Sequence, residues 1–219
     1  MSHTPGTAPV DTPGTAPGTR QAQKRRTRQA LLDAALDLLA EQSLSSLGLR
    51  EVTRAVGITP TAFYRHFRST ADLGVALVEE ALGSLHTAIT GALATTGDGD
   101  SEERIARTVD LIARHVRTHP AHVRFLARER HGGVQQVRDA ISGQLALFAQ
   151  EVSGELARHQ ESDGWSEEDL LMLAGLYVDL MVMTASAFLD AEPGTEETVA
   201  HIARRRMRLV TLGRHHWLD

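Results

Sequence analysis

The sequence predicts an all-α protein, and three of its features indicate this fold class. Apolar residues recur at helical spacing in every long segment after residue 20. Short stretches rich in Gly, Pro, Asp and Ser, such as "TTGDGD", "HGG" and "EPG", separate these segments. No segment sustains the period-two alternation of a half-buried strand. We therefore expect about nine helices joined by short turns.

The first residues predict a disordered tail. Residues 1–19 contain "TPGTAP" twice and almost no large apolar side chain, a composition that cannot support a packed core. The composition changes at Arg20, where "RQAQKRRTRQALLDAALDLLAEQ" begins. Leucines at helical spacing in this segment predict an amphipathic helix whose first half is basic.

The next segments predict two short helices joined by a tight turn. In "SLSSLGLREVTRAVG" the apolar residues that share one helical face are Leu49, Val52 and Val56. Gly57 can adopt the left-handed conformation that ends a helix. Thr59 is a good N-cap and Pro60 a good first helical residue, so the next helix is expected from Pro60 through Phe67.

This third helix has two different faces. Phe63 and Phe67 fall on one face and are expected to pack on the second helix. The residues expected on the outward face are Thr61, Ala62, Arg65 and His66, with Tyr64 on the flank. A long cation among small and polar side chains suits a helix in the DNA major groove, where arginine reaches base edges. The alternative is an ordinary helical hairpin with a polar surface.

The charge distribution is uneven along the chain. Residues 1–68 carry nine cationic and five anionic side chains, whereas residues 69–219 carry fourteen cationic and twenty-three anionic side chains. A basic N-terminal third favours a polyanionic partner at that end, although a solvated basic face would also account for it. We therefore divide the chain into a tail (1–19), a basic helix-turn-helix domain that we expect to bind DNA (20–68), a connecting helix (69–95) and a C-terminal helical domain that we expect to dimerise (96–219).

The C-terminal part predicts further helices and a dimer interface. Ser69 or Thr70 is expected to cap the connecting helix, and the later helices are expected at roughly 101–118, 121–131, 134–159, 166–190 and 195–216. The stretch from Asp169 to Leu189 is apolar nearly all round, so it needs a partner on several faces. We expect a homodimer in which the last two helices pair across a two-fold axis as a four-helix bundle.

A family resemblance adds to these inferences. "TRQALLDAALDLLAEQSLSSLGLREVTRAVGITPTAFYRHFRSTADL" resembles, over nearly fifty residues, the DNA-binding domain of the TetR family of bacterial transcriptional regulators. The resemblance lies in the opening Thr-Arg, in "REVTRAVGI", in "FYRHF" and in the Asp-Leu pair that enters the connecting helix. Thr70 stands where many members carry lysine, and Arg68 could supply the phosphate contact expected there.

The resemblance implies specific DNA contacts. It implies that phosphates are held by Thr59, Tyr64 and His66, and that bases are faced by Thr61, Ala62 and Arg65. Further contacts to phosphate or the minor groove are implied for Lys24, Arg25, Arg26 and Arg28, with Arg50 near the backbone; a solvated basic helix start is the alternative. A dimer would place two such helices in major grooves about 34–36 Å apart on double-stranded DNA, at a pseudo-palindromic operator.

The second domain also carries a resemblance. "HPAHVRFLARERHGG" and "FYRHFRSTADLGVALVEEAL" look like the branch of the family that regulates unsaturated fatty-acid synthesis and senses long-chain acyl thioesters. This implies a repressor with a cavity for a small hydrophobic effector, with long-chain acyl-CoA as the candidate. The side chains expected at the cavity are Leu111, Phe125, Phe148, Leu173, Tyr177, Met181, Thr184 and Phe188, with Arg128 near the phosphates. For each of them, core or dimer packing is the alternative.

Other functional classes find no support in the sequence. Phosphate-binding loops and nucleophile elbows are missing, so we expect neither an enzyme nor a cofactor. His115, His119 and His122 have ligand-like spacing, but Pro120 interrupts their helix and no cysteine is present, so no metal site is expected. We expect no membrane span and no secretory signal, and therefore a cytoplasmic protein. The remaining alternatives are a regulator of a drug-like effector and a non-catalytic helical protein-interaction module.

Overall fold

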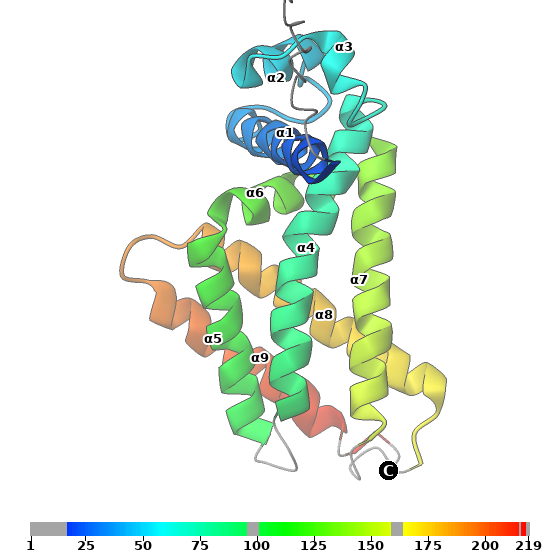
Figure 1. The fold of residues 1–219 in the computed structure, drawn as a ribbon. Helices are drawn as coiled ribbons and strands as arrows, with labels where there is room; N and C mark the ends of the chain where they lie inside the picture. Colours follow the sequence, from blue (N-terminus) through cyan, green and yellow to red (C-terminus); the bar gives the residue numbers. More distant parts are fainter. Residues whose placement is uncertain (1–16, 96–100, 159–163, 215, 218–219) are drawn as a thin grey trace, which may run out of the picture.

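The computed structural model of the 219-residue chain describes residues 17–95, 101–158, 164–214 and 216–217. These residues form nine α-helices and no strand, which confirms the predicted all-α fold class. In chain order the helices are α1 (Pro17–Leu38), α2 (Leu49–Val56), α3 (Pro60–Phe63), α4 (Thr70–Thr95), α5 (Ser101–Thr118), α6 (Pro120–Glu129), α7 (Gln135–Leu156), α8 (Glu167–Leu189) and α9 (Glu196–Arg214). Figure 1 shows α1, α2 and α3 together at one end of an elongated helical body.

Two helix boundaries near the N-terminus differ from expectation. α1 begins at Pro17, so the last residues of the predicted tail are helical, and residues 1–16 of that prediction lie outside the described residues. α3 ends at Phe63, whereas the sequence predicted a helix through Phe67. The chain continues in tighter turns, in which the N–H of His66 donates to the carbonyl of Phe63 at 2.8 Å. These turns still bring Phe67 back to the core.

The helix-turn-helix forms for the local reasons that the sequence indicated. Gly57 has φ 74° and ends α2 in the left-handed conformation, which glycine adopts without steric cost. The hydroxyl oxygen of Thr59 accepts from the N–H of Ala62 at 3.2 Å, and Pro60 follows as the first residue of α3. Ser69 caps α4 in the same way, because its hydroxyl accepts from the N–H of Asp72 at 3.1 Å.

The described residues bury two apolar cores. The first, which we call the N-terminal core, contains residues of α1, α2, α3, α4, α6 and α7. At its centre lie Leu31, Val52, Phe63, Phe67 and Leu77. Phe63 is fully buried and Phe67 is 2% exposed, and Leu49, Val56 and Ile58 pack against the same cluster as expected. The second, the distal core, contains residues of α4, α5, α6, α7, α8 and α9.

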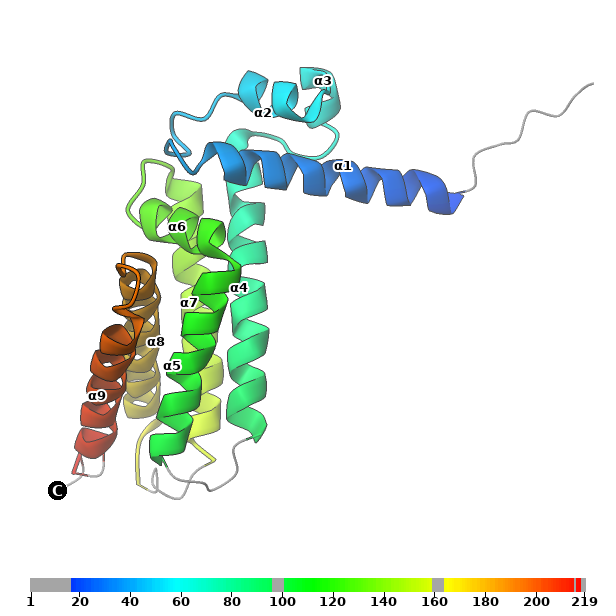
Figure 2. The same ribbon diagram turned by 90° about the vertical axis from the view of Figure 1, so that its left-hand side faces the viewer.

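The arrangement of the long helices connects the two ends of the molecule. α4 belongs to both cores and runs from the α1–α3 unit along the body beside α7 (Figure 1). α6 lies directly beneath α1, at the junction between the small unit and the body (Figure 2). α8 and α9 lie side by side at one edge of the body.

α8 is apolar around most of its circumference, as the sequence indicated. It packs on α5, α6, α7 and α9 and buries Leu173, Ala174, Val178 and Met181. By length and composition alone it is the one helix among the described residues that could cross a membrane. Its contacts on several sides are those of a core helix, and a core helix passes the same test.

Candidate nucleic-acid interface and internal cavity

The surface formed by α3 and the turn after it is exposed and cationic. Thr61 and Arg65 are exposed, and Ala62 is half-buried. Tyr64 is 60% exposed, and its ring packs edge-on against Phe63 at a centroid distance of 5.7 Å. Because the two phenylalanines anchor this segment from below, its polar side chains are held outward on a fixed base. The fold therefore gives the predicted recognition segment the exposure that contact with base edges requires.

His66 lies in the positive field of this surface. Its pKa is lowered, first because the side chain is partly buried and then because Lys24, Arg28 and Arg65 lie nearby. Its Nδ1 atom is buried and has no hydrogen-bond partner among the described residues. A lowered pKa makes His66 neutral near pH 7, so it would contact a phosphate as a neutral donor. The three cations around it form a site that favours a polyanion.

Arg28 has a position that the sequence did not predict. Its Nη1 atom donates to the carbonyl oxygen of His66 at 3.3 Å, and its guanidinium lies 4.3 Å from the centroid of the Phe67 ring. Both contacts fix the turn that follows α3 against α1. Arg28 thus acts first as a brace for the recognition segment, and contact with DNA remains a prediction for it.

The other predicted DNA contacts come from three separate places. Lys24, Arg25 and Arg26 are exposed on the N-terminal half of α1, which projects beyond the body in Figure 2. Arg50 is exposed in the first turn of α2. Arg68 is exposed just before α4, and its backbone N–H donates to the Asp72 carboxylate at 2.9 Å. These exposed cations lie on the same N-terminal unit as α3.

The body of the molecule contains a cavity of about 370 Å³ between α4, α5, α6, α7 and α8. Its wall is mainly apolar, which is typical of sites for small hydrophobic ligands. The apolar lining includes Leu85, Ile89, Leu126, Phe148, Val178, Met181 and Met183. Its polar lining consists of His86, His115, Arg130, His131, Gln144 and Ser186, and no carboxylate of the described residues lines it.

Two of the predicted ligand-binding residues, Phe148 and Met181, line this cavity. Tyr177 and Met181 line a second, smaller cavity of about 80 Å³, where the Tyr177 hydroxyl is hydrogen-bonded to Thr211 at 2.8 Å. Met181 therefore stands between the two cavities.

The other predicted ligand-binding residues lie outside both cavities. Phe125 is buried in the N-terminal core and Phe188 in the distal core, while Leu173 is also buried and Leu111 is half-buried on α5. The hydroxyl of Thr184 donates to the carbonyl of Leu180 at 2.6 Å, within its own helix. Helical spacing places these side chains on inward faces, but it does not distinguish a core position from a cavity wall.

Arg128, predicted to meet a ligand phosphate, instead holds the end of α1. Its Nη1 atom donates to the carbonyls of Leu39 and Gln42, both at 2.7 Å, and its Nη2 atom donates to Ala40 at 3.2 Å. These carbonyls lie at the C-terminal end of α1, where helical partners are missing and a cation is favourable. The guanidinium therefore ties α6 to the DNA-binding unit.

The neighbouring residue, Glu129, completes this tie and was not predicted. It is 1% exposed, and its Oε1 atom accepts from the N–H of Leu44 at 2.9 Å. Gly132 packs so closely on the carboxylate that a Cβ there would clash with Oε2. In the sequence, the glycines of "HGG" indicated only a turn, although they also leave room for a buried acid.

The comparisons with known proteins agree with this geometry. Residues 31–77 match the model for the bacterial regulatory proteins of the tetR family. Three solved structures are similar over most of the chain. They are the fatty acid degradation regulator FadR from Bacillus halodurans, the transcriptional regulator FadR from Bacillus subtilis in complex with stearoyl-CoA, and the TetR family transcriptional regulator PfmR from Thermus thermophilus.

These likenesses are structural rather than close in sequence. The Bacillus halodurans protein has a TM-score of 0.65 and 14% identity, covering 84% of this chain and 94% of its own. The Bacillus subtilis protein has a TM-score of 0.66 and 13% identity, and the match covers 83% of this chain and 96% of that protein. PfmR has a TM-score of 0.59 and 19% identity, and the match covers 81% of this chain and 97% of PfmR. Such identities show the shared fold alone. The family match contains α2, the turn and α3, where the exposed cationic surface lies, so residues 31–77 are similar to the bacterial regulatory proteins of the tetR family, and most of the chain shares the fold of such regulators.

Proposed function

We propose that the chain is a homodimeric repressor of fatty-acid metabolism genes that senses a long-chain acyl-CoA in its 370 Å³ cavity. The observation that carries the proposal is this cavity, which is mainly apolar and lies next to the helix that grips the DNA-binding unit. Leu126 lines the cavity, while two residues later on the same helix Arg128 holds α1. A ligand that favours one position of α6 would thus shift the DNA-binding unit.

The chemistry of the cavity wall suits an acyl thioester. Met181 and Met183 can repack around a flexible chain at little cost. Arg130 and His131 are neighbours in the wall. Arg130 is paired with Asp179 of α8 at 3.3 Å, so an acceptor or anion of the ligand competes with Asp179 for its guanidinium. The structural likeness to a FadR solved in complex with stearoyl-CoA supports the same ligand class.

The effector can be tested with DNA selected by the protein itself from a randomised duplex library. In fluorescence anisotropy, saturated and unsaturated long-chain acyl-CoAs at micromolar concentration should change the affinity for this duplex, while free CoA should not. Met181→Trp should blunt the response because the indole fills the cavity, and DNA binding should persist. Leu147→Trp is the matched control, because Leu147 is 52% exposed on α7 and lies outside the cavity lining.

The outcomes separate the alternatives. If no acyl-CoA changes the affinity, and a drug-like apolar compound does, the lipid proposal is wrong and the drug-effector alternative holds. If Met181→Trp and Leu147→Trp respond equally well to acyl-CoA, the effector does not occupy this cavity.

The proposed dimer rests on an exposed apolar surface at the edge of the body (Figure 2). The large apolar side chains exposed on α8 and α9 are Leu171, Met172, Leu176, Met183, Ile202, Leu209 and Leu212. Leu209 is 72% exposed, which is unusual for leucine on a helix that already has a packed face. A second copy of the same surface would bury these side chains across a two-fold axis, as symmetric dimers do.

Leu209→Glu should break this dimer, because two carboxylates would be buried near the axis without partners. In sedimentation at micromolar concentration, the parent chain should run as a dimer and the variant as a monomer with much weaker operator binding. Leu147→Glu provides the control, since it adds the same charge at an exposed leucine on α7. A parent chain that sediments as a monomer would contradict the proposed dimer.

A further inference from the structure

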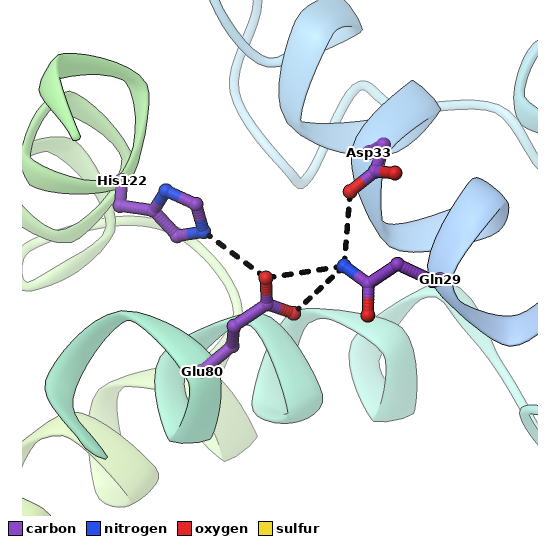
Figure 3. Close-up of polar contacts among 4 residues, drawn as sticks. All are labelled: Gln29, Asp33, Glu80 and His122. Carbon is purple, nitrogen blue, oxygen red and sulfur yellow. Dashed lines mark hydrogen bonds and ion pairs between the residues drawn. The ribbon is translucent and has the colours of Figure 1, made fainter. Parts of the chain in front are cut away.

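A polar junction centred on the carboxylate of Glu80 joins α4 to α1 and α6 (Figure 3). The side-chain amide of Gln29 donates to both carboxylate oxygens of Glu80, at 3.1 and 3.3 Å, and to Asp33 at 2.9 Å. The Nε2 atom of His122 lies 3.6 Å from Oε1 of the same Glu80. One carboxylate therefore links the DNA-binding unit, through Gln29, to α6.

Two further histidines continue this junction into the body. The ring of His119 lies 5.9 Å from that of His122, edge to face, and stacks on that of His115 at 4.8 Å. His115 lines the internal cavity. The three imidazoles thus form a line from the cavity wall to Glu80. This is the histidine motif with ligand-like spacing in the sequence; in the structure one pair of rings is stacked and the other meets edge to face.

The environment of the line determines where it can carry a proton. The pKa of His115 is lowered to about 4, first by burial and then by the proximity of His119 and His122, so this end stays neutral at physiological pH. The other end faces Glu80 from α4, and beyond it Asp33 from α1. On the α6 side, Arg130 already pairs with Asp179 of α8 at 3.3 Å. His122 is thus the imidazole of the three that faces a carboxylate.

We propose that the histidine line, which is His115, His119 and His122, makes operator affinity depend on pH. An imidazolium at His122 binds Glu80, which holds α1 in place through Gln29. We call this contact the proton-sensitive brace. An imidazolium at His122 gains the attraction of the carboxylate, so the brace is strongest at acidic pH. It weakens as the pH rises and the proton leaves. This inference requires DNA binding but does not depend on the identity of the effector.

The test is a double-mutant cycle on the full-length chain. Affinity for the duplex selected by the parent protein is measured by anisotropy at about pH 6 and about pH 8, where histidine changes charge. His122→Gln and Glu80→Gln should each change the ratio of the two dissociation constants by about 1.5- to 5-fold, the range for a partly exposed pair. The double variant should give no further change, because either substitution alone removes the same contact.

Matched controls isolate the junction from other titrating groups. Glu79→Gln removes the same charge at an exposed neighbour on α4, and His201→Gln removes an exposed histidine on α9. Both variants should keep the parent's ratio of the dissociation constants at the two pH values. Any contribution of His66 at the DNA interface is common to every variant. Thermal unfolding checks that each variant is folded. An unchanged pH ratio in His122→Gln and Glu80→Gln, or strictly additive effects in the double variant, would overturn the proposal.

Discussion

Phe63→Ala is expected to unfold the DNA-binding unit while the helical body remains folded. Phe63 is fully buried at the centre of the N-terminal core, and α2 and α3 are too short to be stable without it. Removing the ring should cost about 3–5 kcal/mol through lost transfer free energy and the cavity that remains. Chemical denaturation followed by circular dichroism should show this loss, together with loss of binding to all duplexes.

The neighbouring aromatic residue provides the control for this prediction. Tyr64→Ala removes a ring of similar size that is 60% exposed, so it should leave stability close to that of the parent. If both substitutions reduced stability equally, the division of this segment into a buried face and an exposed face would be incorrect.

Arg65→Ala is expected to weaken operator binding by about 1–3 kcal/mol and to relax base preference, the effect of losing a bidentate pair with guanine. Arg65 is the long cation on the exposed surface of α3 and its following turn, and its side chain does not support the core. Binding to the selected duplex and to duplexes with single base changes would measure both effects.

Arg54→Ala is a suitable control for Arg65→Ala, because Arg54 is an exposed arginine in the last turn of α2. It should lower affinity for all duplexes about equally if it contacts phosphate, or leave affinity unchanged. An Arg65→Ala variant that discriminates among bases as the parent does would show that another residue reads the sequence.

The fold was largely predictable because strong local signals agreed with one another. Gly57, Thr59 and Pro60 fix the turn between α2 and α3 through backbone conformation and capping, which are properties of the residues themselves. The early end of α3 was not predictable from these signals. The turn that follows α3 is in contact with Arg28, distant in sequence, which donates to the carbonyl of His66 and stacks on Phe67.

The cavity was less predictable than the DNA-binding surface. Exposure of Arg65 follows from helical geometry once Phe63 is placed in the core. A cavity wall, in contrast, is defined by where five helices fail to meet, and that depends on all of their side chains together. Sequence spacing could identify Phe148 and Met181 as inward-facing, but it could not separate them from Leu173 or Phe125, which pack in filled regions.

The polar contacts between the two units were beyond sequence reasoning for a similar reason. The sequence predicted that Arg128 lies near ligand phosphates and predicted no role for Glu129. In the structure both side chains bind backbone groups of the segment that follows α1, more than eighty residues earlier. Such long-range side chain to backbone bonds have no local signature in a single sequence.

The most direct test of the account is the salt dependence of binding to the selected duplex. Exposed cations on α1, on α2 and in the segment between α3 and α4 should release counterions from DNA, so the logarithm of affinity should fall linearly with the logarithm of salt concentration. We expect a steep slope between about 50 and about 200 mM salt, reduced by about one unit for each phosphate-contacting cation removed per site. An affinity that does not change with salt, or no selectable duplex at all, would contradict a DNA-binding regulator and favour the protein-interaction module.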